Sequence, residues 1–196
     1  NPENKKKSPL YLLETVKPYI LRRLKSQVLD ELPAVTEMDF AVELCASQVN
    51  DYKNIWEERY NIAKKEGSHF SVLSKLRKVC DGGREPSENA KILATSDLIK
   101  KIKSNNEKVI IFSYYLDPLY ALEAKLNLEN INSVRFFDVD IDAREEAIED
   151  FKNDASITAF IASSRIASEG LTLTEANNVI FLNRWWNPSS NSQARD

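Results

Sequence analysis

The sequence is poor in the residues that build metal centres and disulfide frameworks. Its 196 residues include two cysteines, Cys45 and Cys80, and one histidine, His69. These side chains cannot supply a four-ligand zinc site, and two distant cysteines do not predict the disulfide framework of a small secreted domain. We expect both thiols to be buried and free, in an intracellular protein.

Long hydrophobic runs are also missing. No apolar stretch approaches the ~20 residues that cross a bilayer, so neither a membrane span nor a membrane partner is predicted. The first ten residues are polar and basic, lack an initiator Met and do not resemble a signal peptide. We therefore expect the chain to be an excised piece of a longer protein.

What the sequence does contain is enough apolar material for a core and one local excess of positive charge. Hydrophobic residues make up 42% of the chain, and its net charge of −3 argues against a generally basic nucleic-acid coat. Residues 1–30 nevertheless hold seven Lys/Arg against three Asp/Glu. Arg22, Arg23 and Lys25 lie close together there, and they predict either a phosphate-facing patch or a solvated helix face.

Residues 1–86 are predicted to be a mostly helical appendage. Apolar spacing of three and four favours a helix over 10–29 interrupted at Pro18, and another from an N-cap at Ser47 to about Lys65, ending before Gly67. Alternation over 36–44 predicts a half-exposed strand. A further helix over about 70–80 is expected to bury Phe70, Leu73, Leu76 and Cys80. Gly and Pro make residues 81–87 the clearest break in the chain.

After the break, short apolar runs alternate with helical patterns. The expected strands are 108–113, 134–137, 157–162 and 179–182. The expected helices are Ser87–Lys103, one capped by Asp117 before Pro118, and one opened by a capping box of Asp142 and Glu145. This alternation predicts a parallel sheet with helices on both faces, in an α/β fold.

Polar residues follow all four expected strands. They are Ser113, Asp138, the pair Ser163 and Ser164, and Asn183. In an open parallel sheet, ligands bind outside the carboxyl ends of the strands, so we predict a site along this edge.

Several motifs occur in an order typical of one family. They are Leu21-Arg22-Arg23-Leu24-Lys25, Glu31-Leu32-Pro33, Val109-Ile110-Ile111-Phe112-Ser113, residues 163–176, Trp186-Asn187-Pro188 and Gln193-Ala194. Together they resemble the Swi/Snf family of DNA-dependent ATPases in helicase superfamily 2. The resemblance implies a RecA-like parallel sheet flanked by helices, the P-loop NTPase-type second lobe of a motor, over 87–196 and truncated within motif VI. It implies a linker and helical protrusion over 1–86. The sequence of residues 183–196 resembles that of bacterial members, which favours a location in the bacterial cytoplasm.

The resemblance also implies roles for individual residues. Those expected to face the DNA backbone are Ser113, Ser163, Ser164, Arg165, Trp186, Arg22, Arg23 and Lys25. Hydroxyls, backbone N–H groups and guanidinium groups are what phosphate contacts require. Those expected to lie beside the nucleotide are Gly170, Thr172 and Gln193. Each has a structural alternative: Ser113 and Ser163 as helix caps, Arg165 as a surface ion pair, Gly170 as a turn residue and Trp186 as a packing aromatic.

The sequence departs from the family pattern in ways that limit what this chain does by itself. It has Ala167-Ser168 where the family usually has two glycines, and Thr172 where it usually has Asn, so the loop should be stiffer. It stops before the arginines that complete motif VI, and it has no G-x-x-x-x-G-K-[ST] loop. We therefore expect no catalytic residues and no metal site in this chain, and ATP and Mg²⁺ bound mainly by an upstream lobe.

The resemblance thus predicts one lobe of an ATP-dependent double-stranded DNA translocase, a chromatin-remodeller-like helicase whose isolated fragment is inactive. Its partners would be DNA, the upstream lobe and a protein on the helical protrusion. Two alternatives stay open. One is a stand-alone nucleotide-binding module, and the other is a helical protein-interaction platform on an α/β scaffold.

Overall fold

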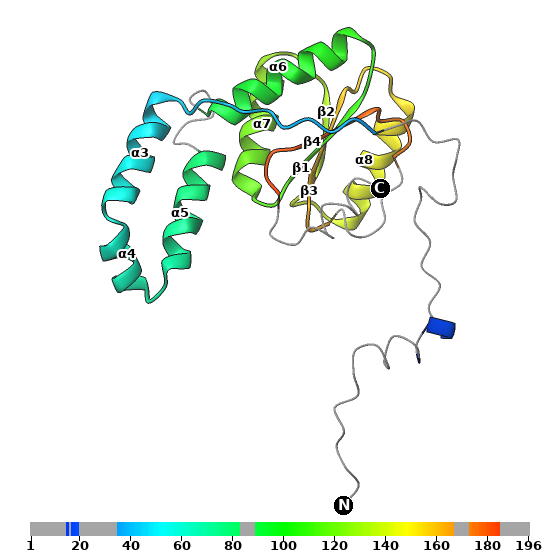
Figure 1. The fold of residues 1–196 in the computed structure, drawn as a ribbon. Coiled ribbons are helices and arrows are strands. Elements are labelled where there is room, and N and C mark those ends of the chain that lie inside the picture. The colour runs from blue at the N-terminus through cyan, green and yellow to red at the C-terminus, as the bar shows by residue number, and fades with distance from the viewer. Residues whose placement is uncertain (1–14, 16, 20–34, 83–88, 167–172, 185–196) are drawn as a thin grey trace, which may run out of the picture. The chain divides into compact units, whose positions relative to one another are not determined.

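The structure is a computed structural model that describes residues 15, 17–19, 35–82, 89–166 and 173–184. The chain divides into two compact units, Asn1–Phe40 and Ala41–Asp196. In the first unit a short 3-10 helix, η1 (Lys17–Tyr19), includes Pro18, where the sequence predicts a turn. The remaining helices and strands of the described part belong to the second unit (Figure 1).

A four-stranded parallel sheet lies at the centre of the second unit. Its strands are β1 (Val109–Ser113), β2 (Ser133–Phe136), β3 (Ala159–Ser163) and β4 (Asn178–Phe181), in the order β2-β3-β1-β4. Every residue of β1 and β3 is buried, as expected for central strands that are covered on both faces. Each strand overlaps its predicted range, so the predicted parallel α/β sheet is confirmed.

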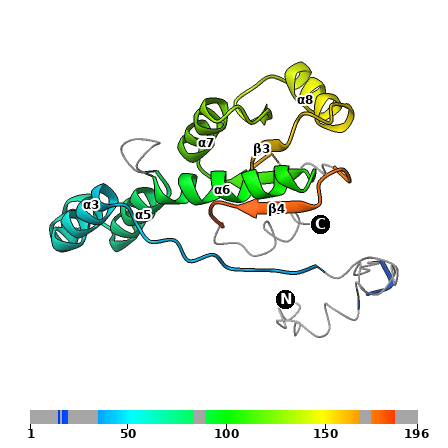
Figure 2. The same ribbon diagram turned by 90° about the horizontal axis from the view of Figure 1, so that it is seen from above.

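Three helices cover the two faces of the sheet: α6 (Ala90–Ser104), α7 (Leu116–Leu128) and α8 (Ile141–Asn153). Side chains alternate along each strand, so Val109 and Ile111 of β1 join one apolar cluster and Ile110 and Phe112 join another. The first cluster includes residues of α6 and α7, and the second includes residues of α8. Figure 2 shows α7 and α8 on opposite sides of the strands.

The predicted starts of two of these helices are wrong by two residues. Helix α7 begins at Leu116 with Tyr115 as its N-cap, so Asp117 lies in the first turn and not at the cap. Pro118 is tolerated there because the first-turn N–H groups have no partner within the helix. Helix α8 is capped by Asp140, whose carboxylate accepts a hydrogen bond from the Ala143 N–H at 2.9 Å, and not by a box of Asp142 and Glu145.

The helical part before the sheet has three helices where the sequence predicts two. They are α3 (Ala46–Glu57), α4 (Arg59–Glu66) and α5 (His69–Asp81), and the cap of α3 is Cys45, not Ser47. The break falls at Glu58. The Arg59 guanidinium donates to the Trp56 carbonyl at 2.6 Å and lies over the Trp56 ring, which satisfies a carbonyl at the end of α3. Gly67 ends α4 with φ +69°, as predicted.

The buried stripe of α5 differs from the predicted one. Phe70 and Leu73 are exposed, whereas Val72 and Leu76 are buried and pack with Ala63 of α4. Spacing by three and four fits both stripes, and the position of α4 decides between them.

The strand predicted over 36–44 is wrong, because no strand is assigned there. Met38 and Phe40, which the alternation places on its buried side, are 71% and 62% exposed. An extended segment becomes a strand only when a neighbouring strand takes its backbone hydrogen bonds. Both cysteines are free and half-buried. Among the described residues, no helix has the length and apolar character needed to cross a bilayer.

Candidate functional site

Three of the predicted strand-end residues meet at the carboxyl edge of the sheet. Ser113 and Ser163 are partners in the register of β1 and β3, and Asn183 follows β4. The Asn183 amide nitrogen donates to the Ser113 hydroxyl at 2.9 Å, and its carbonyl oxygen accepts from the Tyr114 N–H at 2.8 Å. The ends of β1 and β4, which are 70 residues apart in the chain, are therefore held together by side chains.

The Ser113 hydroxyl serves the fold and is not open to a ligand. Ser113 is 0% exposed, and its hydroxyl donates to the Tyr115 carbonyl at 2.8 Å while accepting from the Tyr115 N–H at 3.2 Å. These bonds tie Ser113 to Tyr115, which is the N-cap of α7, so Ser113 is not itself the cap. The next residue, Tyr114, is half-buried.

The turn after β3 brings a positive charge to the same edge. The Ser164 N–H donates to the Ser113 carbonyl at 2.9 Å, and the Ser163 hydroxyl accepts from the Arg165 N–H at 3.4 Å. Ser164 is half-buried and Arg165 is exposed. The Arg165 guanidinium carbon lies 4.3 Å from the centre of the Tyr114 ring, a cation–π contact that orients it beside the end of β1.

Two further arginines lie at this edge. Arg184 follows Asn183 and is exposed. Arg77 comes from α5, donates to the Arg184 carbonyl and lies 5.8 Å from the Tyr115 ring centre. A guanidinium stays charged at all ordinary pH values, so α5 and the ends of β3 and β4 together supply fixed positive charge.

Asp138, at the end of the outer strand β2, is engaged locally. It has φ +51°, and its carboxylate accepts a hydrogen bond from the Tyr120 hydroxyl. This hydrogen bond raises the pKa of Tyr120 above its ordinary value. The positive part of the edge therefore runs over β3, β1 and β4, and an acidic residue stands at its β2 end.

Several predicted site residues lie outside the part of the chain that the structure describes. They are Arg22, Arg23, Lys25, Gly170, Thr172, Trp186 and Gln193. Of the predicted DNA-facing residues, the structure brings together Ser113, Ser163, Ser164 and Arg165. Within the described ranges, no group of three or more His, Cys, Asp or Glu side chains is placed to hold a metal ion.

Sequence reasoning missed Tyr114, Arg77 and Arg184 as residues of this edge. Tyr114 and Arg184 follow strand ends directly, so their positions alone could have marked them. Arg77 carries no such signal, because only the packing of α5 brings it there.

Comparison with known proteins identifies the class to which this fold belongs. Residues 90–196 match the helicase conserved C-terminal domain family, and residues 2–85 match the SNF2-related domain family. The chain is 30% identical to mouse DNA excision repair protein ERCC-6 over 94% of its own length and 14% of that protein. It is 29% identical to an ATP-dependent helicase of Mycoplasma genitalium, over 94% of its own length and 19% of that protein.

Two solved structures from Sulfolobus solfataricus are similar in fold. A SWI2/SNF2 ATPase C-terminal domain superposes with a TM-score of 0.65 at 26% identity, covering 74% of this chain and 71% of that one. The SWI2/SNF2 ATPase core in complex with double-stranded DNA gives a TM-score of 0.71 at 26% identity, covering 96% and 44%.

Residues 90–196 are therefore a helicase-type C-terminal domain with a RecA-like sheet. More particularly, the chain belongs to the Swi/Snf family of helicase-like proteins in superfamily 2. It spans a fifth or less of the length of the two curated relatives named above. Those relatives come from an animal and a bacterium, so they do not support the predicted bacterial cytoplasm.

Proposed function

We propose that the full-length protein is an ATP-driven double-stranded DNA translocase and that this chain is its second motor lobe. The observation that carries the proposal is the carboxyl edge of the sheet, where the ends of β1, β3 and β4 adjoin and where Arg165 and Arg184 are exposed. Support also comes from the similar Sulfolobus ATPase core, which was solved with double-stranded DNA.

In this proposal the edge holds one sugar–phosphate chain. The Arg165 guanidinium and the Ser164 hydroxyl contact phosphates, which sets the register of the protein on DNA without reading bases. The turn after β3 and the segment after β4 continue the contact. Its further members are Ser163 and Trp186. Arg22, Arg23 and Lys25 belong to the first unit, and we propose them separately as contacts with DNA.

The proposal also includes a nucleotide site. Gly170, Thr172 and Gln193 form one wall of a cleft whose opposite wall is the upstream lobe of the longer protein. That lobe holds most of the ATP and its Mg²⁺, because this chain lacks the G-x-x-x-x-G-K-[ST] loop that cradles phosphates. The 196-residue chain therefore does not hydrolyse ATP by itself.

The test compares Arg165→Gln with Lys101→Gln in a chain extended to include both lobes. Lys101 is an exposed cation on α6, far from the proposed contact in the sequence. We expect Arg165→Gln to raise the DNA concentration for half-maximal ATPase stimulation several-fold. The slope of log affinity against log salt should fall by ~1, because one phosphate contact is lost. Lys101→Gln should change neither.

Two results would contradict the proposal. The first is an extended protein whose ATPase activity does not respond to double-stranded DNA. The second is robust ATP turnover by the 196-residue chain, or tight ATP binding by it, which would favour a stand-alone nucleotide-binding module.

A second candidate function rests on the helices before the sheet. Three aromatic side chains on α3, α4 and α5 are more than half exposed: Trp56 at 51%, Tyr60 at 67% and Phe70 at 59%. Aromatic residues are enriched in protein interfaces, so this surface favours a protein-interaction platform. Selective capture of a partner by the 196-residue chain through residues 1–86, without any effect of DNA on ATPase activity, would support it over the translocase.

A further inference from the structure

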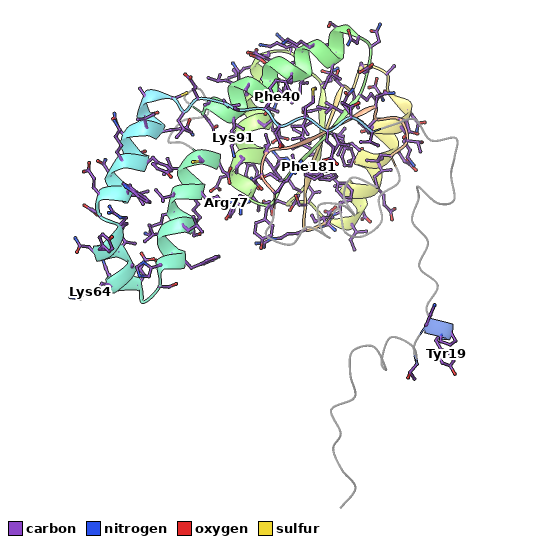
Figure 3. All side chains as sticks on the ribbon, viewed as in Figure 1. Tyr19, Phe40, Lys64, Arg77, Lys91 and Phe181 are labelled. Atoms are coloured by element: carbon purple, nitrogen blue, oxygen red, sulfur yellow. The ribbon has the colours of Figure 1, made fainter. Side chains whose placement is uncertain are left out.

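Two cations, one on α5 and one on α6, donate hydrogen bonds to the backbone just after β4. The Lys91 ammonium of α6 donates to the Leu182 carbonyl at 3.2 Å, and the Arg77 guanidinium of α5 donates to the Arg184 carbonyl. Figure 3 labels both side chains, one on α5 and the other on α6. Helices α5 and α6 therefore contact residues 182–184, in addition to the neighbouring strand.

One buried carboxylate holds both cations. Asp81, the last residue of α5, is 3% exposed, and its Oδ1 lies 2.5 Å from the Lys91 ammonium. Its Oδ2 lies 3.7 Å from the Arg77 Nε and is buried with no hydrogen-bond partner. Asp81 thus holds the side chains of Lys91 and Arg77 in place. These side chains in turn hold the carbonyls of Leu182 and Arg184.

Asn89 joins the helices that carry Asp81 and Lys91. Its amide nitrogen donates to the Asp81 carbonyl at 2.9 Å, and its side-chain oxygen accepts from the N–H groups of Lys91 and Ile92. The end of α5 and the start of α6 are therefore joined, and neither Asp81 nor Lys91 can move without the other.

Leu182, just after β4, makes a backbone hydrogen bond to β1. The Leu182 N–H donates to the Phe112 carbonyl at 2.9 Å, one residue beyond the end of β4. The carbonyls of Leu182 and Arg184 are bonded by the two cations, and Asn183 between them binds β1. The next two residues are Trp185 and Trp186.

A buried ion pair is weak evidence for stability, because desolvation of the charges opposes their attraction. Its better-attested use is to specify one geometry among several. The network here donates hydrogen bonds to two carbonyls where β4 leaves the sheet. A role in specifying the backbone geometry fits that placement.

We propose that Lys91 and Arg77 are positioning residues that set the path of the chain after β4, and that Asp81 holds both in place. Through them the helices α5 and α6 align Trp186 on the DNA. The alignment of Trp186 on the DNA rests on the proposed function. The positioning of the chain after β4 does not, because it concerns only the residues of this chain.

The first test therefore needs neither DNA nor ATP. The chain has three tryptophans, so Trp56→Phe leaves Trp185 and Trp186 as the only ones. In this background we expect Lys91→Met to shift the emission maximum and to increase quenching by acrylamide, because the segment after Leu182 loses a tether. Lys91→Arg, which keeps the charge and the donors, should restore the parent spectrum in part.

Lys100→Met is the matched control. Lys100 also lies on α6 and forms two ion pairs, at 3.2 Å to Asp97 and 2.8 Å to Glu129, but neither partner follows β4. We expect it to leave the tryptophan spectrum unchanged. Arg77→Met is a second test variant, for use if Lys91→Met fails to fold by circular dichroism. Equal spectra for Lys91→Met, Arg77→Met and Lys100→Met would overturn the proposal.

The second test uses the extended, two-lobe protein. Lys91→Met should raise the half-stimulating DNA concentration several-fold, with Lys91→Arg recovering part of the loss and Lys100→Met showing none. An altered tryptophan spectrum without an altered DNA response would overturn the alignment of Trp186. A parent protein with no DNA response would overturn the translocase and leave the positioning of residues 182–184 to be decided by fluorescence.

Discussion

At the scale of single residues, polar side chains at the carboxyl edge divide into two sets. Ser113 and Asn183 face inward and bind each other, whereas Arg165 and Arg184 are exposed. Burial of a hydroxyl and an amide is tolerated here because both are hydrogen-bonded. The inward set therefore fixes the geometry on which the exposed set depends.

Replacement of Ser113 by Ala should destabilise the protein through its partner. The substitution removes the acceptor of the buried Asn183 amide nitrogen, and an unsatisfied buried donor costs ~1–3 kcal/mol. Urea denaturation should show this loss in the free energy of unfolding. The control is Ser104→Ala, an exposed serine bonded to its own helix, for which we expect a change within about 0.5 kcal/mol. Equal losses for the two variants would contradict a closing role for Ser113.

This division could be predicted from the sequence only in part. The place of each strand end follows from where an apolar run stops, so the edge and its polar residues were predictable. Whether Ser113 faces inward depends on Asn183, 70 residues later, and no local pattern carries that information. The same holds for Arg77, which reaches the edge only because α5 packs there.

At the scale of secondary-structure elements, the central strands were predictable and several helix starts were not. Strands β1 and β3 are short apolar runs bounded by polar residues, and few other conformations bury such runs. The helix starts involve competing caps, and near α8 both Asp140 and Asp142 are plausible. The chain uses Asp140, whose carboxylate reaches the Ala143 N–H. The prediction of a strand over 36–44 is wrong for a different reason. Alternation of apolar and polar residues does not ensure that a neighbouring strand is there to pair with.

One carboxylate links α6 to the end of α7. Burial raises the pKa of Glu129, but hydrogen bonds from Lys100, Lys125 and Ser96 outweigh burial and lower it to about 2. A folded-state pKa below the ordinary value of 4.5 means that the ionised form is favoured by folding. The resulting stabilisation is present above pH 4.5 and is lost as the pH falls towards 2.

The stability of a Glu129→Gln variant should therefore approach that of the parent in acid. We expect the difference between their free energies of unfolding to be largest near neutral pH and to shrink below about pH 4.5, because the parent then takes up the proton. Urea denaturation at a series of pH values measures it. Glu146→Gln, an exposed glutamate of α8, controls for general effects of charge removal. A difference that stays constant with pH would contradict this account.

At the scale of the whole second unit, the helical part depends on the α/β part. The cluster within α4 and α5 has three buried residues, Ala63, Val72 and Leu76, whereas the sheet carries a large cluster on each face. So small a core cannot offset the entropy of ordering three helices. Gln48 of α3, which is fully buried, joins the parts: it accepts from the Ala90 N–H at 3.0 Å and donates to the Val79 carbonyl at 2.8 Å.

Replacement of Gln48 by Ala should therefore loosen α3–α5 without loosening the sheet. It removes the partner of the buried Ala90 N–H, at a cost of ~1–3 kcal/mol, and the bond to the carbonyl of the half-buried Val79. We expect amide hydrogen exchange to become faster in α3, α4 and α5 while β1 and β3 keep their protection, because the lost bonds lie at the junction. Asn61→Ala, at an exposed position of α4, should change neither set. If the strands and the helices lose protection equally, the second unit opens as a single cooperative whole and α3–α5 are not a separable attachment.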